Sequence, residues 1–152
     1  MSAPFNDVFA KTCEAGAGLL AAIPLGAPVY QGEGTEDMVT PCVRLYAETA
    51  EEEDPQYSGN FWANFNAEVI YPAPVSIGTA DTKAPNDLLV QTVFDTFSSS
   101  TLPTDLNALA SPVDDFTCIA VRNRQVRFET SGNQWINTLT MQLLVCASSL
   151  YP

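Results

Sequence analysis

The stretch NFWANFNAEVIY, residues 60–71, decides the fold class more clearly than any other part of the chain. Apolar or small residues occupy every second position of it: Phe61, Ala63, Phe65, Ala67, Val69 and Tyr71. Asn64, Asn66 and Glu68 stand between them. Because successive side chains of a strand point to opposite faces, this alternation predicts a strand in a sheet that is buried on one side only.

The segment before it predicts a partner strand. TPCVRLYAET, residues 40–49, has the composition of a strand, and the acidic sequence EEEDPQYSGN at 51–60 separates it from the first stretch. We expect the two strands to form a hairpin with a long loop over residues 48–60.

Helical periodicity occurs in two places. Residues 6–22 place apolar side chains on one helical face, with Asn6 as the expected N-cap and Pro24 just beyond the end. A second helix is expected to start at about Asn86, after a long loop over residues 72–85, and its apolar stripe includes Leu89 and Val93. A short helical turn is expected at Leu102, Leu106 and Leu109 as a minor element.

The last third of the chain reads as β-structure. Residues 116–122 and 126–130 predict two strands or one long bent strand, residues 131–133 predict a turn, and WINTLTMQLLVCA at 135–147 predicts a final strand. Strands and helices are segregated along the chain, which is typical of α+β proteins. We therefore predict one domain over residues 1–152, with a mostly antiparallel sheet of four to five strands and two helices packed on one face.

Composition excludes several classes of function. Eighteen acidic and six basic residues give a net charge of −12, so sequence-independent DNA binding, which needs clustered Lys and Arg, is not expected. The chain has no histidine, which removes Ser-His-Asp and Cys-His catalysis and most zinc sites. No apolar run approaches the ~20 residues of a membrane span, and no signal peptide is apparent, so we expect a protein that stays soluble in the cytoplasm where it is made. We predict no enzyme activity, no metal and no cofactor.

The four cysteines, Cys13, Cys42, Cys118 and Cys146, lie among apolar or small neighbours and form no CxxC pair. A domain of this size does not need disulfides. Buried free thiols are the favoured interpretation, and a disulfide is the alternative.

Two charged clusters are candidate functional features. The acidic cluster is Glu51, Glu52, Glu53 and Asp54, and a second acidic pair is Asp114 and Asp115. A carboxylate enzyme would hold two such groups across a rigid cleft, but these lie beside prolines in predicted loops, which favours solvated tips. The basic cluster, at residues 122–127, is Arg122, Arg124 and Arg127. It is interpreted as a solvated hairpin tip, as an interface that meets acidic groups of a neighbour, or as a DNA contact; the acidic cluster is the obvious partner for the second interpretation.

The order of these elements resembles a known family. PCVRLYAE, NFWANFNAEVIY and the terminal WINTLTMQLLVCA, with a helix before the first and between the last two, resemble the tail terminator proteins of long-tailed bacteriophages, also called tail completion or neck proteins. The similarity covers most of the chain, but it is one of pattern without a diagnostic motif.

The resemblance implies a virion protein in the tail or neck, assembled in the host cytoplasm. It implies a hexameric ring that caps the tail tube, ends tube polymerisation and docks to the head connector or head-closure protein. Six copies would carry a charge of −72, six times −12, around an acidic channel through which DNA passes without specific binding. The alternatives are a head-closure or other neck or tail subunit, a generic cytoplasmic adaptor and, last, a small carboxylate enzyme.

Overall fold

The computed structural model describes residues 4–32, 38–52, 60–72 and 80–147. Three helices and five strands follow one another in the order α1 (Pro4–Ala21), β1 (Val29–Gln31), β2 (Cys42–Glu52), β3 (Asn60–Pro72), α2 (Ala80–Phe97), α3 (Leu102–Asn107), β4 (Phe116–Ser131) and β5 (Gln134–Ala147).

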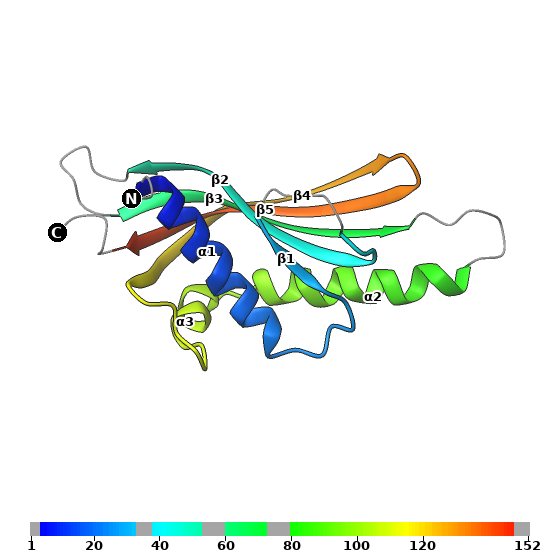
Figure 1. Cartoon of the computed structure of the whole chain (residues 1–152), viewed down its shortest axis with the longest axis horizontal. Helices are drawn as coiled ribbons and strands as arrows, with labels where there is room; N and C mark the ends of the chain where they lie inside the picture. The colour runs from blue at the N-terminus through cyan, green and yellow to red at the C-terminus, as the bar shows by residue number, and fades with distance from the viewer. Residues whose placement is uncertain (1–3, 33–37, 53–59, 73–79, 148–152) are drawn as a thin grey trace.

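All five strands belong to one sheet in the order β1-β2-β3-β5-β4 (Figure 1). Only β1 and β2 are parallel, and the other three pairs are antiparallel. The strand that alternates most clearly in the sequence, β3, is the central one. The predicted α+β class with a mostly antiparallel sheet is confirmed.

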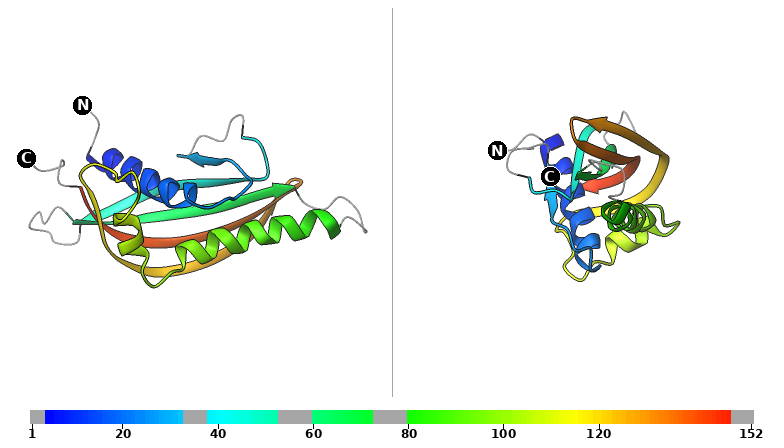
Figure 2. Two further views of the ribbon diagram at one scale, coloured as in Figure 1. Left: turned by 90° about the horizontal axis from the view of Figure 1, so that it is seen from below. Right: turned by 90° about the vertical axis from the view of Figure 1, so that its right-hand side faces the viewer.

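The core lies between one face of this sheet and the helices. Both α1 and α2 cover that face, as Figure 2 shows from below. Gly16 lets α1 approach the sheet closely, because a Cβ atom there would lie 2.9 Å from Cζ of Phe65 and 3.3 Å from Cδ1 of Leu45. From α2, the ring of Phe97 packs on Phe65 with the centroids 5.3 Å apart. These contacts bury large apolar side chains, each of which contributes roughly 1.5–3 kcal/mol to folding.

Both long helices start earlier than the cap signals predict. The first helix begins at Pro4, which suits the first helical position because its missing N–H has no partner there in any case. The second begins at Ala80, so Asn86 is a buried residue within the helix and not its N-cap. Pro85 lies within this helix, so intrinsic propensity does not explain its early start.

Both loops are shorter than the sequence predicted, because the neighbouring elements extend into them. Strand β2 continues to Glu52, with a register irregularity between Ala47 and Ala50, so the connection predicted at 48–60 narrows to residues 53–59. The loop predicted at 72–85 ends before Ala80. The minor turn after α2 is a helix of six residues, α3.

The basic cluster does not form a hairpin tip. Strand β4 is one continuous strand of 16 residues, and Arg122 lies in its middle, where the register shifts before Gln125. The tip is at Gly132, whose φ of +60 meets the positive-φ requirement of a two-residue hairpin loop. No helix within the described ranges is both long and apolar enough to cross a membrane.

Candidate subunit interface

The two outermost strands, β1 and β4, form opposite edges of the sheet. An edge strand presents backbone N–H and C=O groups that no strand of its own sheet satisfies. What lies beside each edge therefore determines whether it can bind another chain.

The first part of β4 is covered by a side chain of the same subunit. Asn107, at the end of α3, accepts a hydrogen bond from the Cys118 N–H (2.8 Å) and donates one to the Cys118 carbonyl (2.7 Å). One side-chain amide thus takes the place of a neighbouring strand. The outer edge of β4 is closed at this point.

Arg124 closes the middle of the same edge. Its Nε donates to the Phe97 carbonyl (3.1 Å) and its Nη2 to the Ser99 carbonyl (2.7 Å). These carbonyls lie at and just beyond the C-terminal end of α2, which has no basic residue in its own last turn. A cation there offsets the partial negative charge of the helix end. Arg124 therefore ties α2 to β4.

Arg122 is also engaged within the subunit, on the sheet face opposite the helices. Its guanidinium lies 3.8 Å from the centroid of the Trp62 ring, and its Nε donates to Oε1 of Gln142 at 2.9 Å. Gln142 in turn donates to Oδ1 of Asn64 at 3.0 Å. This network spans β4, β5 and β3 and holds Arg122 in place.

The last part of β4 differs from the first. Val126 and Phe128 have exposed fractions of 65% and 55%, and Arg127 between them is also exposed. Phe128 is the outer end of a row of aromatic rings: it packs edge-on against Trp135, which packs edge-on against Tyr71. The row begins in the core and ends, uncovered, at the sheet edge.

The described part of the acidic cluster lies at the end of β2, with two strands between it and β4. Glu51 is exposed and Glu52 ends β2, whereas Glu53 and Asp54 lie outside the described residues. Strands β3 and β5 separate β2 from β4. The structure therefore brings the three arginines together on one strand, and that strand does not pair with the strand that carries Glu51 and Glu52.

The open face of the sheet carries a buried ion pair that the sequence analysis missed. Arg44 on β2 donates to both carboxylate oxygens of Glu68 on β3, with Nε–Oε1 at 3.1 Å and Nη2–Oε2 at 3.0 Å. The two residues occupy polar positions of paired strands, and that pairing was the available signal. Nearby, Asn66 Nδ2 and Thr138 Oγ1 are buried without a hydrogen-bond partner.

The open face is concave. The pKa of the Tyr46 hydroxyl is raised chiefly by burial, and the positive charge of Arg127 acts on the same pKa in the opposite direction. A hollow on this face is lined from β2, β3, β4 and β5, by side chains that include Glu48, Asn64, Gln125 and Thr140, in keeping with the strong curl of the sheet in Figure 2.

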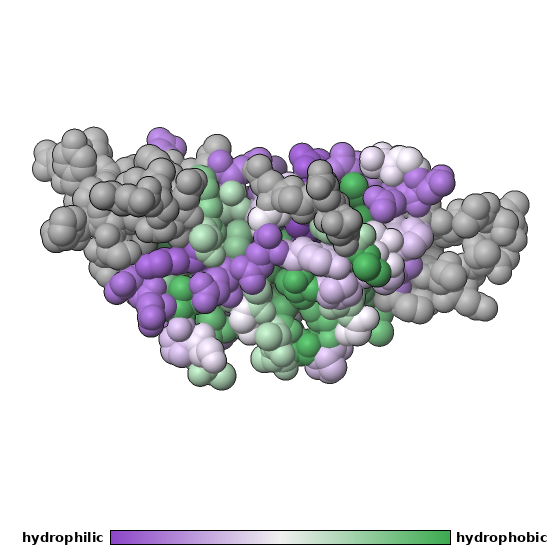
Figure 3. Space-filling view, viewed as in Figure 1, coloured by the Kyte–Doolittle hydropathy of each residue, from purple (hydrophilic) through white to green (hydrophobic). Residues whose placement is uncertain are grey.

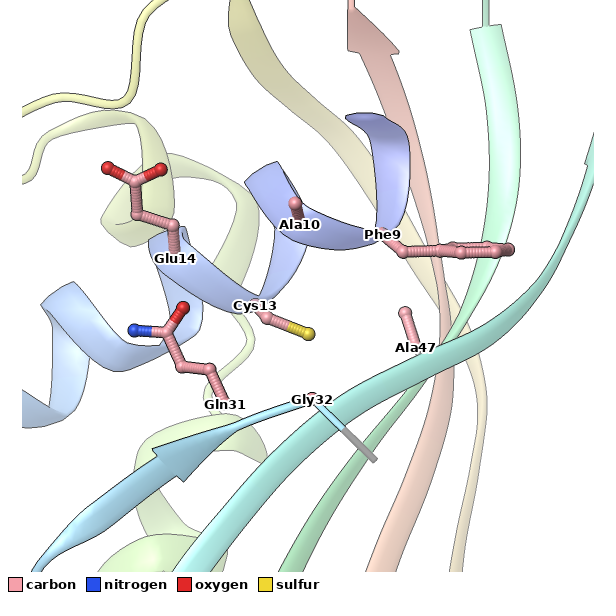
Figure 4. Close-up of a pocket in the computed structure, with 7 residues that line it drawn as sticks. All are labelled: Phe9, Ala10, Cys13, Glu14, Gln31, Gly32 and Ala47. Atoms are coloured by element: carbon pink, nitrogen blue, oxygen red, sulfur yellow. The ribbon is translucent and has the colours of Figure 1, made fainter. Parts of the chain in front are cut away.

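A hollow of about 570 Å³ lies beside the β1 edge, between α1 and β2 (Figure 4). Phe9, Ala10, Cys13 and Ala47 give it apolar walls, and Glu14 stands at its rim. Burial raises the pKa of the Cys13 thiol to about 11. A thiol so protonated at neutral pH is a poor nucleophile.

All four cysteines are free thiols; Cys13, Cys42 and Cys118 are buried and Cys146 is partly exposed. Across the described part of the chain, no three His, Cys, Asp or Glu side chains are grouped as metal ligands would be. Hydrophobic residues reach the surface where the end of α1 meets α2, with hydrophilic residues around them (Figure 3).

No protein-family model matches this sequence, and no curated protein matches it. Among solved structures, a similar fold occurs in a chain of a structure described as the virion of a native gene transfer agent particle, with a TM-score of 0.53 and 14% sequence identity. The match covers 88% of this chain and 92% of that chain. The two chains thus share a fold over nearly their whole lengths.

Proposed function

We propose that this protein is a structural virion component: a subunit of a hexameric ring that caps a phage-type tail tube, ends its polymerisation and docks to the head connector. Two independent observations support the proposal. The sequence resembles tail terminator proteins, and the fold is similar to that of a chain in a phage-like virion particle over 88% of this chain. The full-length fold similarity carries the most weight.

A closed ring needs a heterologous contact, in which one patch of each subunit meets a different patch of the next. The sheet offers two such patches with opposite charge. Strand β4 carries Arg122, Arg124 and Arg127, and the end of β2 with the residues that follow carries Glu51, Glu52, Glu53 and Asp54. In the described part of the chain β3 and β5 lie between β2 and β4, so we infer that basic and acidic groups of neighbouring subunits meet in the ring.

Such charges act mainly on partner choice and register. A single exposed ion pair is worth about 0.2–1 kcal/mol, but repetition around a ring adds its effect at every contact. Arg122 and Arg124 are held by contacts within the subunit, so they act from fixed positions. Arg127 is exposed.

The channel of such a ring would repel DNA. Each subunit carries a net charge of −12, so a hexamer carries −72, six times that value. Nucleic-acid affinity rises with the number of phosphates that Lys and Arg neutralise. We therefore infer passage of DNA without specific binding, and a role in assembly in place of catalysis.

The first test is the mass of the purified protein by native mass spectrometry. A hexamer has a mass of about 98 kDa, six times 16.4 kDa. The second is electron microscopy of tubes formed by the tail tube protein of the same particle, with and without this chain. We expect tubes of limited length with a ring at one end.

Arg127→Glu is expected to weaken the ring more at low than at high salt, because screening reduces the effect of any surface charge. Thr104→Ala, an exposed change on α3, is the matched control. A protein that stays monomeric at all concentrations and leaves tube length unchanged would contradict the proposed function.

A further inference from the structure

We propose that neighbouring subunits of this ring join by strand pairing, with the outer edge of β4 of one subunit antiparallel to the outer edge of β1 of the next. This inference rests on the proposed ring, and it specifies the contact that closes it. Four features of the described residues support it: the rows of the sheet, the backbone directions at both edges, the side chains there and the parts of β4 that are already closed.

Three rows of residues run across all five strands. The first joins Val29, Val43, Val69, Asn137 and Phe128; the second joins Tyr30, Arg44, Glu68, Thr138 and Arg127; the third joins Gln31, Leu45, Ala67, Leu139 and Val126. The exposed stretch of β4 therefore lies level with β1, at the opposite edge. A copy placed beside this one without a shift along the strands brings these two edges together.

The backbone of β1 points the right groups outward. The Pro28 carbonyl accepts from the Val43 N–H, and the Gly32 N–H donates to the Leu45 carbonyl. Backbone groups of a strand alternate in direction, so those of Val29 and Gln31 point away from β2. Among the described residues, no further backbone hydrogen bond engages these outward groups.

The backbone of β4 matches this pattern. Ser131 and Gln134 flank a two-residue hairpin loop and so form a hydrogen-bonded pair. Counting back in steps of two, Glu129 and Arg127 also point their backbone groups toward β5. Val126 and Phe128 then direct their N–H and C=O groups outward, away from the sheet.

When the two edges are joined in this register, their outward backbone groups form hydrogen-bonded pairs without any shift along the strands. Phe128 of one subunit lies opposite Val29 of the next, and Val126 lies opposite Gln31. Strands β1 and β4 run in opposite directions in one subunit, since β1 is parallel to β2 and each following neighbour is antiparallel. A copy rotated about an axis close to the strand direction keeps that relation, as antiparallel pairing requires.

The side chains agree with this register. Val29 packs against the hydrophobic core, so the exposed ring of Phe128 would extend the apolar face of the next subunit. Tyr30 and Arg127 meet on the polar face, where a guanidinium can stack on the tyrosine ring as Arg44 does on Tyr46 at 4.6 Å. Apolar groups thus meet apolar groups, and a cation meets an aromatic ring.

The closed part of β4 fits the same contact. Asn107 and Arg124 prevent strand addition over the first part of β4. In the unshifted register this part lies level with the end of β2, beyond the last residue of β1, because Glu51 and Ala120 share a row through Trp62 and Leu144. Arg122 and Arg124 of one subunit are thereby brought level with the acidic end of β2 in the next, whereas Arg127 lies level with Tyr30.

The test is an engineered disulfide between copies. Tyr30→Cys and Arg127→Cys are combined in one chain in which Cys146, the cysteine that is not buried, is changed to Ser. Within a subunit the two positions lie on different edge strands. An intersubunit disulfide is identified on the gel because it doubles the chain mass, which a disulfide within one subunit does not. In the proposed contact the two positions form a non-hydrogen-bonded pair with Cα atoms about 4.5 Å apart, inside the range that a disulfide bridges.

The matched control is Tyr30→Cys with Ser131→Cys, which places the second thiol four residues out of register. After mild oxidation, non-reducing electrophoresis should show multiples of the chain mass up to six, with about tenfold more cross-linking for the matched pair than for the control. Native mass spectrometry before oxidation measures the ring itself, and circular dichroism checks folding. If the first pair fails to fold, Val29→Cys with Phe128→Cys tests the same register.

The outcomes separate this inference from the proposed function. Ring formation together with register-dependent cross-linking supports both. Ring formation with equal cross-linking of matched and control pairs overturns the strand pairing and leaves the ring intact. Monomers without cross-links overturn both, and cross-linked chains longer than six copies support the pairing but contradict ring closure.

Discussion

The two halves of β4 differ in what lies beside their outer edge. From Phe116 to Arg124, helices of the same subunit supply partners, through Asn107 and through the end of α2. From Gln125 to Ser131, no partner lies beside the edge in the described part of the chain, and Val126 and Phe128 are exposed. An open apolar edge invites pairing with another chain, which proteins normally prevent. Here the contacts that cover the edge end at Arg124, and we infer that the rest of the edge is left open for a partner.

The largest expected difference in stability is between the substitutions of two arginines, one from each half of β4. Arg124→Ala removes two charge-assisted hydrogen bonds and leaves carbonyls at the end of α2 without these donors, so we expect a loss of about 3 kcal/mol in the free energy of unfolding. Arg127→Ala, on the exposed half, should cost less than about 0.5 kcal/mol. Urea denaturation of both variants measures the difference, and equal losses would contradict the division of β4 into two halves.

A somewhat smaller effect is expected at the other closed point. Asn107→Ala removes both hydrogen bonds to Cys118 and exposes a strand edge, for a loss of about 2 kcal/mol. Thr104→Ala on the same helix is the control and should be close to neutral. Hydrogen exchange should also speed up at Cys118 in the first variant alone; unchanged exchange there would show that the amide is not a substitute for a strand.

The exposed half of β4 was harder to predict from the sequence than β3 and β5. Alternation identified β3 and β5 because each has one apolar face toward the helices and one more polar face away from them, which produces a period of two. On β3 the second face is also buried at Asn66, Glu68 and Ile70, so the expectation of burial on one side only was wrong there. The exposed half of β4 buries neither face, so its residues show no alternation, and Arg122, Arg124 and Arg127 were interpreted as a tip. The actual strand is long because register irregularities absorb the mismatch with β5.

The side-chain contacts that cover the first half of β4 could not be predicted from the sequence. Arg124 lies 27 positions from Phe97, and Asn107 lies 11 positions from Cys118. No local pattern links residues so far apart until α2 and α3 are placed on the sheet. The early start of α2 shows the reverse case, in which the helix extends to the N-terminal side of a clear local capping signal at Asn86 although Pro85 disfavours it.

The closed half also contains a pH-sensitive group. Burial raises the pKa of the Cys118 thiol from 9.0 to about 11, so above pH 9 the unfolded chain loses this proton before the folded one does. Stability contributed by the thiol is therefore fully present below pH 9 and is lost as the pH rises toward 11. We expect Cys118→Ala to remove about 1 kcal/mol of the decrease in unfolding free energy between pH 8 and pH 10. Identical pH slopes for the two proteins would contradict the buried position of this thiol.

The smallest expected effect on stability, with the largest effect on assembly, lies in the open half. Phe128→Pro removes a backbone N–H that points away from β5, so the ladder between β4 and β5 keeps all its hydrogen bonds and the monomer should lose at most about 1 kcal/mol. Arg127→Pro is the matched control one residue away. Its N–H points toward β5, and its loss should cost about 3 kcal/mol or more.

These two prolines decide whether the open edge of β4 is a binding surface. In the proposed ring, the Phe128 N–H donates to β1 of the next subunit, and a proline ring there also obstructs the approach of that strand. Phe128→Pro should therefore stay folded by circular dichroism and near-normal in urea denaturation while failing to form rings in native mass spectrometry. A Phe128→Pro protein that assembles like the wild type would show that the edge is open for some other reason, and β4 would then have no part in ring closure.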